Sequence, residues 1–180
     1  LSDAIADIAA DIGCSVDGDR AVVALRTLSS QAERDAAVGL AGQLLAHPAF
    51  PAQLLAREAA RTMASIREDD TRPAALAHKA FWRTMYGAHP YGQSPTVETV
   101  ARISSKDLRS FHRKHYVTRR SVVAIVGDVS REEANRIAQT LTQDLPQAEG
   151  ELAPLPEVAA SKARVVRMPH PASQAHIMMG

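Results

Sequence analysis

A continuous β-branched run in the second half of the chain limits the folds open to this sequence. The stretch "SVVAIVGDVS", residues 121–130, holds five apolar residues in succession before a Gly-Asp pair. Such a run, without polar alternation, is typical of a strand that is covered on both faces. We therefore expect residues 121–127 to form a buried strand in which the valines and Ile125 are nearly all covered.

Most of the remaining chain has helical periodicity. Apolar residues recur at helical spacing in six segments, which we predict as helices: 1–12, 31–46, 52–69, 73–86, 104–116 and 131–145. Three further runs read as strands: 21–29, 163–171 and 173–180.

These elements do not follow a strict β-α-β alternation, so the predicted class is α+β. We expect an antiparallel sheet that includes 21–28 and 121–127. The helices of 31–46, 52–69 and 104–116 should pack mostly on one face of it, giving a two-layer domain.

Local signals mark several helix starts. Ser30 with Glu33, and Ser130 with Glu133, have the spacing of capping boxes. Pro51 and Pro73 stand where a first-turn proline is tolerated. Gly13 follows the first apolar stripe, where a helix-ending glycine is expected.

The Pro/Glu/Ala-rich stretch 147–162 predicts a linker. It would separate a first domain, residues 1–146, from the start of a second domain at 163–180. Because Leu1 already lies inside a helical pattern, we expect the chain to be a piece of a longer protein.

Composition excludes several kinds of partner and site. The net charge of +1 gives no support for nucleic acid or an anionic membrane as a partner. No apolar run approaches the roughly 20 residues that cross a bilayer. Cys14 is the one cysteine, which rules out an internal disulfide and a cysteine zinc cluster. We expect Cys14 to be a small buried apolar residue.

The loop "YGAHPYGQSPTVETV", residues 86–100, has the composition of a catalytic loop. No nucleophile or paired carboxylate stands beside His89 in sequence, however, so we predict a structural role. Tyr86 and Tyr91 should bury their rings there.

Three other clusters have a functional and a structural interpretation. His112 and His115 have the i, i+3 spacing of a metal pair, but two ligands are too few and cations adjoin them. Glu68, Asp69 and Asp70 lie beside arginines and are predicted to form solvated ion pairs.

The third cluster is a basic run, which forms a phosphate or RNA surface, a solvated helix face or a path for an acidic peptide. Its members are Arg109, Arg113, Lys114, Arg119 and Arg120. Five positive charges on a chain with a net charge of +1 more often form a solvated helix face.

Several segments, in this order, resemble the M16 family of pitrilysin, insulinase and mitochondrial-processing-peptidase-like proteins. They are "HPAFP", "YGAHPYGQSPTVETVARISSKDLRSFHRKHYVTRRSVVAIVGDVSREEA" and "SQAHIMMG". The resemblance covers nearly the whole chain. It implies an α+β domain with an antiparallel sheet backed by helices around a substrate chamber. Active members are zinc peptidases that cut extended peptides.

The resemblance also implies where zinc would be bound. The family uses two histidines of an HxxEH helix, a motif absent from these 180 residues and expected upstream of Leu1. The third ligand is a glutamate. In "REAARTMASIREDD" the family pattern aligned on Glu58 puts Ser65 at that position, and a slip of one helical turn would put Glu68 there.

The resemblance therefore favours a non-catalytic subunit, which forms a peptide-binding chamber with a catalytic M16 partner or a second copy and holds no zinc in this segment. An active zinc endopeptidase and a structural scaffold subunit are the alternatives. Bacterial relatives favour the periplasm as its compartment.

Overall fold

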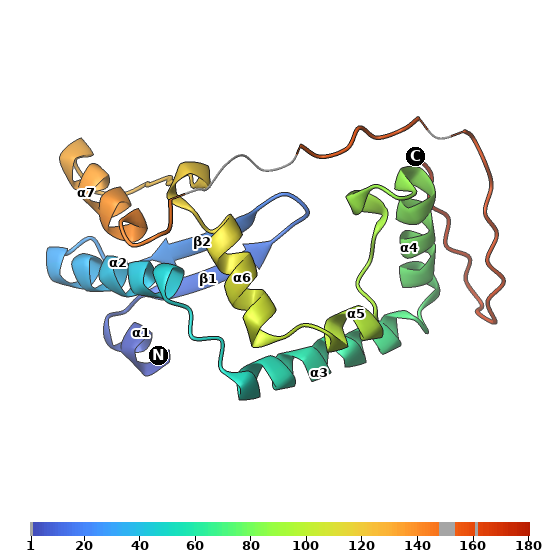
Figure 1. The fold of residues 1–180 in the computed structure, drawn as a ribbon, viewed down its shortest axis with the longest axis horizontal. Coiled ribbons are helices and arrows are strands. Elements are labelled where there is room, and N and C mark those ends of the chain that lie inside the picture. The colour runs from blue at the N-terminus through green and yellow to red at the C-terminus, as the bar shows by residue number, and fades with distance from the viewer. Residues whose placement is uncertain (1, 148–153, 161) are drawn as a thin grey trace. The chain divides into compact units, whose positions relative to one another are not determined.

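A computed structural model of the chain describes residues 2–147, 154–160 and 162–180, and in Figure 1 helices predominate. The described elements are α1 (Ser2–Asp7), β1 (Asp11–Val16), β2 (Ala21–Arg26), α2 (Gln31–Ala46), α3 (Ala52–Asp69), α4 (Pro73–Tyr86), the 3-10 turn η1 (Pro90–Gly92), α5 (Val97–Ala101), α6 (Ser105–His115), the 3-10 turn η2 (Thr118–Arg120) and α7 (Arg131–Thr142). Helices combined with an antiparallel sheet confirm the predicted α+β class. None of the helices in the described ranges has the length and apolarity needed to cross a membrane.

The chain divides into two compact units. The first unit comprises residues 1–50 and 108–151, and the second comprises residues 51–107 and 152–180. This division cuts across the predicted domain boundary near residue 146, which stays a prediction.

The first unit contains the antiparallel hairpin of β1 and β2. Its register runs from Asp11 opposite Arg26 to Val16 opposite Ala21. The turn of the hairpin lies at "DGDR", residues 17–20, where the Asp17 carboxylate accepts backbone N–H bonds from Asp19 at 2.8 Å and Arg20 at 2.9 Å. Those two bonds, with the Arg20 charge, hold the pKa of Asp17 below its ordinary value.

The core of the first unit lies where α2 packs against α7. Ala37, Val38 and Ala41 of α2 are buried. Gly42 allows the close approach, because a Cβ there would lie 2.9 Å from the carbonyl oxygen of Thr140. Small residues on this face thus bring the two helix backbones together.

The predicted buried strand at 121–127 is wrong for the residues that the structure describes. This segment has no strand assignment, and Val122 and Val126 are 94% and 101% exposed. Val123 is 38% exposed, and Ile125 is half-buried. The physical reason is that β-branched residues favour a strand only where a neighbouring strand supplies hydrogen bonds, and the described sheet has two strands.

The predicted first helix is too long. It ends at Asp7, Ala9 adopts a left-handed φ of 49°, and Gly13 lies inside β1. Pairing of Ile12 with Leu25 across the hairpin outweighs the helical spacing of the apolar residues. Cys14 is consequently exposed on the strand, which corrects the expectation that it is buried.

The second unit is built from α3, α4, η1, α5 and the segment 162–180. Ile66 of α3 and Val100 of α5 are buried. The predicted bounds of α3 and α4 are confirmed: α3 follows Pro51, which is its N-cap, and Pro73 opens α4 as predicted. Gly87 ends α4 with a φ of 57°.

Predicted strands at 163–171 and 173–180 are also wrong. Both segments lack strand pairing and are exposed, with Val165 at 83% and Met179 at 90%. As at 121–127, no described strand pairs with them.

The two predicted capping boxes differ in outcome. Ser130 and Glu133 form a complete box at α7. At α2 the Ser30 hydroxyl donates to the Glu33 carboxylate, without a side-chain bond to the helix backbone. A third box, Thr96 with Thr99, starts the short helix α5, which the sequence analysis did not predict.

Candidate functional site

The zinc-ligand position indicated by the resemblance lies on α3. Ser65 is exposed there, beside the buried Ile66, and Glu68 is exposed one helical turn further on. Zinc favours thiolate, imidazole and carboxylate ligands, so the neutral hydroxyl of Ser65 does not fit it. Within residues 2–147, 154–160 and 162–180, no three His, Cys, Asp or Glu side chains gather as a metal site would require.

Carboxylates near this position are engaged with cations. Glu58 lies 3.1 Å from an Arg57 guanidinium nitrogen. At the end of α3, Asp69 pairs with Arg72, and Asp70 accepts from Lys79 Nζ at 2.8 Å. Ion pairing was predicted for Glu68, Asp69 and Asp70, and the described residues show it for Asp69 and Asp70 but not for Glu68. Lys79 was not foreseen as a partner.

The loop after α4 is held by His89. Its ring is buried: Nδ1 accepts from the Tyr91 backbone N–H at 3.2 Å, and Nε2 lies 3.1 Å from the Pro156 carbonyl oxygen. Because Nδ1 accepts, Nε2 carries the proton and donates to Pro156. Both ring nitrogens therefore form hydrogen bonds to backbone groups, as expected for the predicted structural role.

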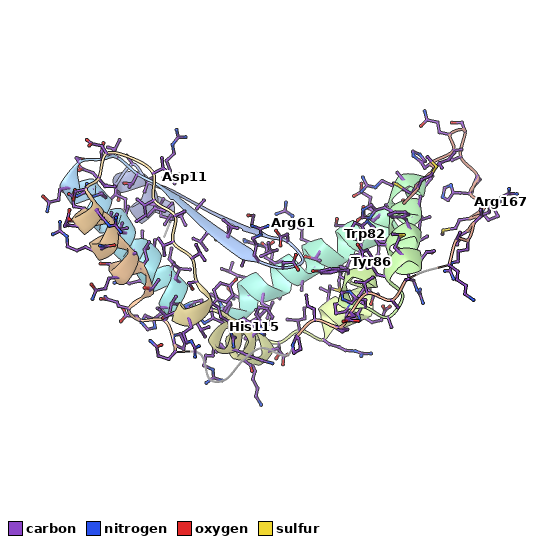
Figure 2. The ribbon with its side chains drawn as sticks, turned by 90° about the horizontal axis from the view of Figure 1, so that it is seen from above. Asp11, Arg61, Trp82, Tyr86, His115 and Arg167 are labelled. Atoms are coloured by element: carbon purple, nitrogen blue, oxygen red, sulfur yellow. The ribbon has the colours of Figure 1, made fainter. Side chains whose placement is uncertain are left out.

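An aromatic cluster surrounds that histidine. Tyr86 stacks on Trp82 with ring centroids 5.2 Å apart and contacts Tyr91 edge-on at 5.6 Å. Figure 2 labels Trp82 and Tyr86 on α4. Trp82 Nε1 donates to His78 Nε2 at 2.8 Å. The rings of Trp82, Tyr86 and Tyr91 are half-buried, and they pack the loop onto the helix, whereas His78 is exposed.

His112 and His115 of α6 have separate partners. His112 is buried, its Nε2 lies 2.7 Å from the Leu45 carbonyl oxygen, and its ring stacks on Tyr116. His115 stacks on Phe111 at 4.3 Å. His112 is thus a buried histidine of α6, whereas Phe111 next to it is 57% exposed.

The basic run is mostly exposed and partly bonded to backbone. Arg109 donates to the Ala49 carbonyl at 3.2 Å, and Arg120 donates to the Lys114 carbonyl at 3.0 Å. Those bonds attach the two arginines to neighbouring backbone. They favour the interpretation of the basic run as a solvated helix face.

One pocket in the second unit was missed by the sequence analysis. Its volume is about 500 Å³, and two arginines from distant parts of the sequence, Arg83 and Arg164, line it. The available signal was the distribution of charge: no Asp or Glu stands between Asp70 and Glu98 or after Glu157.

Comparison with known proteins places this geometry in a family. The model of the peptidase M16 inactive domain matches residues 102–180. A solved peptidase M16 inactive domain from Pseudomonas fluorescens superposes with a TM-score of 0.86 and 32% identity, over 90% of this chain and 40% of that chain. Residues 102–180 thus belong to the M16 peptidase family.

Three other proteins are also similar to this chain. The zinc protease PqqE of Helicobacter pylori is 24% identical over 52% of this chain and 21% of its own length. An uncharacterized zinc protease of Mycobacterium leprae is 34% identical over 38% of this chain and 16% of its own length. A solved protease from Helicobacter pylori shares the fold, with a TM-score of 0.73 at 20% identity over 89% of this chain and 39% of that chain. The chain thus spans less than half the length of each.

Proposed function

We propose that this M16 chain belongs to a non-catalytic subunit, which helps to form a peptide-binding chamber with a catalytic partner. The observation that carries the proposal is Ser65. Ser65 lies on α3. With the family pattern aligned on Glu58, it takes the position of the glutamate ligand, and a hydroxyl is a poor substitute for a carboxylate as a zinc ligand at neutral pH.

Two further observations support this function. The family model that matches residues 102–180 describes an inactive domain, and the similar Pseudomonas fluorescens structure is an inactive domain too. Two other carboxylates of the helix, Glu58 and Asp69, are paired with arginines.

An active zinc endopeptidase is the second candidate. Glu68 favours it, because this exposed carboxylate lies one helical turn from Ser65. Two curated relatives are also named as zinc proteases. In that case the two histidine ligands would belong to an HxxEH motif upstream of Leu1 in the same protein.

Reconstitution with a partner tests the proposal. The intact protein that carries this chain is purified and mixed with an M16 protein of the same organism that has an HxxEH motif. We expect no peptide cleavage by the intact protein alone, and cleavage by the mixture at least about tenfold faster than by the partner alone. Glu68→Gln should leave the activity of the mixture unchanged.

The opposite results identify the alternatives. Cleavage by the intact protein alone that Glu68→Gln abolishes would establish the active endopeptidase. If the partner gains no activity and the mixture binds no peptide, the subunit is a scaffold and the proposal is wrong.

A further inference from the structure

The pocket of the second unit lies at the end of α4, where the chain passes into η1. It is lined by the last turn of that helix and by the segment around Arg164. Residues that shape it are Ala80, Arg83, Thr84, Gly87, Arg164 and Val166. Two of these residues, Ala80 and Gly87, are small and leave space in the pocket. Its volume of about 500 Å³ falls within the range of small-ligand sites.

A hydrogen bond fixes one arginine of the pocket. Arg164 Nη2 donates to the Thr84 hydroxyl at 3.3 Å, which ties the 162–180 segment to α4. Because that hydroxyl oxygen accepts from Arg164, its own O–H can rotate to donate to a ligand in the pocket. The lining therefore offers two guanidinium groups and a hydroxyl donor.

Among the residues that the structure describes, no carboxylate neutralises the positive charge of the lining. No described Asp or Glu lines the pocket. At the other end of α4, Asp69 and Asp70 pair with Arg72 and Lys79, so they do not compensate it. In the described part of the chain, neither arginine of the pocket has a carboxylate partner.

We propose that this pocket binds a carboxylate, the acidic side chain of a peptide held by the subunit. A guanidinium matches a carboxylate with two parallel N–H donors, and two such groups with a hydroxyl can saturate its oxygens. Val166, half-exposed at 51%, supplies an apolar wall for the methylene groups of that side chain. The proposal rests on the proposed function, because a peptide-binding subunit is what brings such a ligand to the site.

The position of the pocket makes both arginines necessary. The carbonyl end of a helix carries partial negative charge, which disfavours an anion beside the last turn of α4. Arg83 offsets this charge from within that turn, and Arg164 adds the second cation. We therefore expect the loss of either arginine to abolish the preference for an acidic ligand.

Peptide binding to the intact protein tests the site. Two blocked peptides are compared by fluorescence anisotropy at about 0.15 M salt. They carry the same neutral dye and differ in one central residue, glutamate or glutamine. The variants are Arg83→Gln and Arg164→Gln. Arg167→Gln is the matched control, since it removes the same charge from the same segment without lining the pocket (Figure 2 labels Arg167).

The expected result is at least tenfold tighter binding of the glutamate peptide. Arg83→Gln and Arg164→Gln should each remove that preference, and Arg167→Gln should change it less than twofold. Equal losses in all three variants would indicate general electrostatic attraction and overturn the proposal. Equal affinity of the two peptides would overturn it as well.

Inorganic phosphate, used as a competitor, separates two sources of the anion. If phosphate binds with the same dependence on Arg83 and Arg164 while the acidic peptide shows no preference, the pocket takes a free oxyanion and the peptide assignment is wrong. Binding of the glutamine peptide reports on the proposed function separately. If that peptide binds but the glutamate peptide gains nothing, only the carboxylate site fails.

Discussion

Arg34 Nη2 lies 2.9 Å from Glu133 Oε1, and this pair joins the first turn of α2 to the first turn of α7. The Arg34 side chain is 10% exposed and that of Glu133 is 30% exposed, so the arginine is the buried partner. Arg34 also donates to the Ser29 carbonyl at 3.2 Å, while its Nε atom is buried without a hydrogen-bond partner. The pair therefore stabilises the α2–α7 packing only while both partners are present.

Replacing Arg34 by methionine should destabilise the first unit. The change keeps most of the volume but removes a charge-assisted hydrogen bond, which is worth about 2 kcal/mol when it is partly buried. Urea unfolding measures the loss. Arg20→Met is the control, because its ion pair with Asp17 is exposed and should contribute far less. Equal effects of the two variants would contradict the importance of the Arg34 pair.

Two glycines of α2 form a matched pair for a packing test. A Cβ at Gly42 would lie 2.9 Å from the Thr140 carbonyl oxygen, whereas a Cβ at Gly39 meets nothing within 4 Å. Gly42→Ala should cost about 1–3 kcal/mol through overpacking. Gly39→Ala should stabilise the helix by roughly 0.5–1 kcal/mol. Thermal melting that moves in the same direction for both variants would refute the close α2–α7 contact.

Removal of the His89 ring should loosen the second unit. His89→Ala loses the bonds to Tyr91 and to Pro156, and leaves a cavity under the aromatic cluster. We expect a loss of about 2 kcal/mol and faster proteolysis within residues 154–160. His47→Ala, at an exposed histidine, is the control. Unchanged proteolysis in His89→Ala would show that this histidine does not hold the segment.

Acidification should weaken the packing of α6 through His115. Its burial first, and then the charges of Lys114 and Arg120, lower its pKa in the folded state. The unfolded chain therefore takes up a proton at a higher pH than the folded chain. Stability is full above about pH 6.5 and is lost as the pH falls from there through the folded pKa. His115→Gln should flatten this part of the curve of unfolding free energy against pH; an unchanged slope would exclude His115 as the cause.

Local sequence signals predicted most of the helices. A proline at the start and a glycine at the end determine the bounds of α4. The predicted bounds of α2 and α3 also match the structure. Such signals act within a few residues of the helix end.

Features that depend on distant residues were not predictable in the same way. Strand formation at 121–127 depends on a neighbouring strand. Burial of His112 results from the end of α2, through the Leu45 carbonyl. The pocket joins Arg83 to Arg164, and only the fold brings these residues together.

Zinc binding tests the central claim, that Ser65 replaces the third zinc ligand, most directly. The intact protein is titrated with zinc by calorimetry at neutral pH, together with its Ser65→Ala and Glu68→Gln variants. Because a zinc site needs about three suitable protein ligands, we expect no stoichiometric site tighter than roughly micromolar in any of the three proteins. A single tight site that Ser65→Ala leaves intact and Glu68→Gln abolishes would contradict the claim and make Glu68 the ligand of an active peptidase.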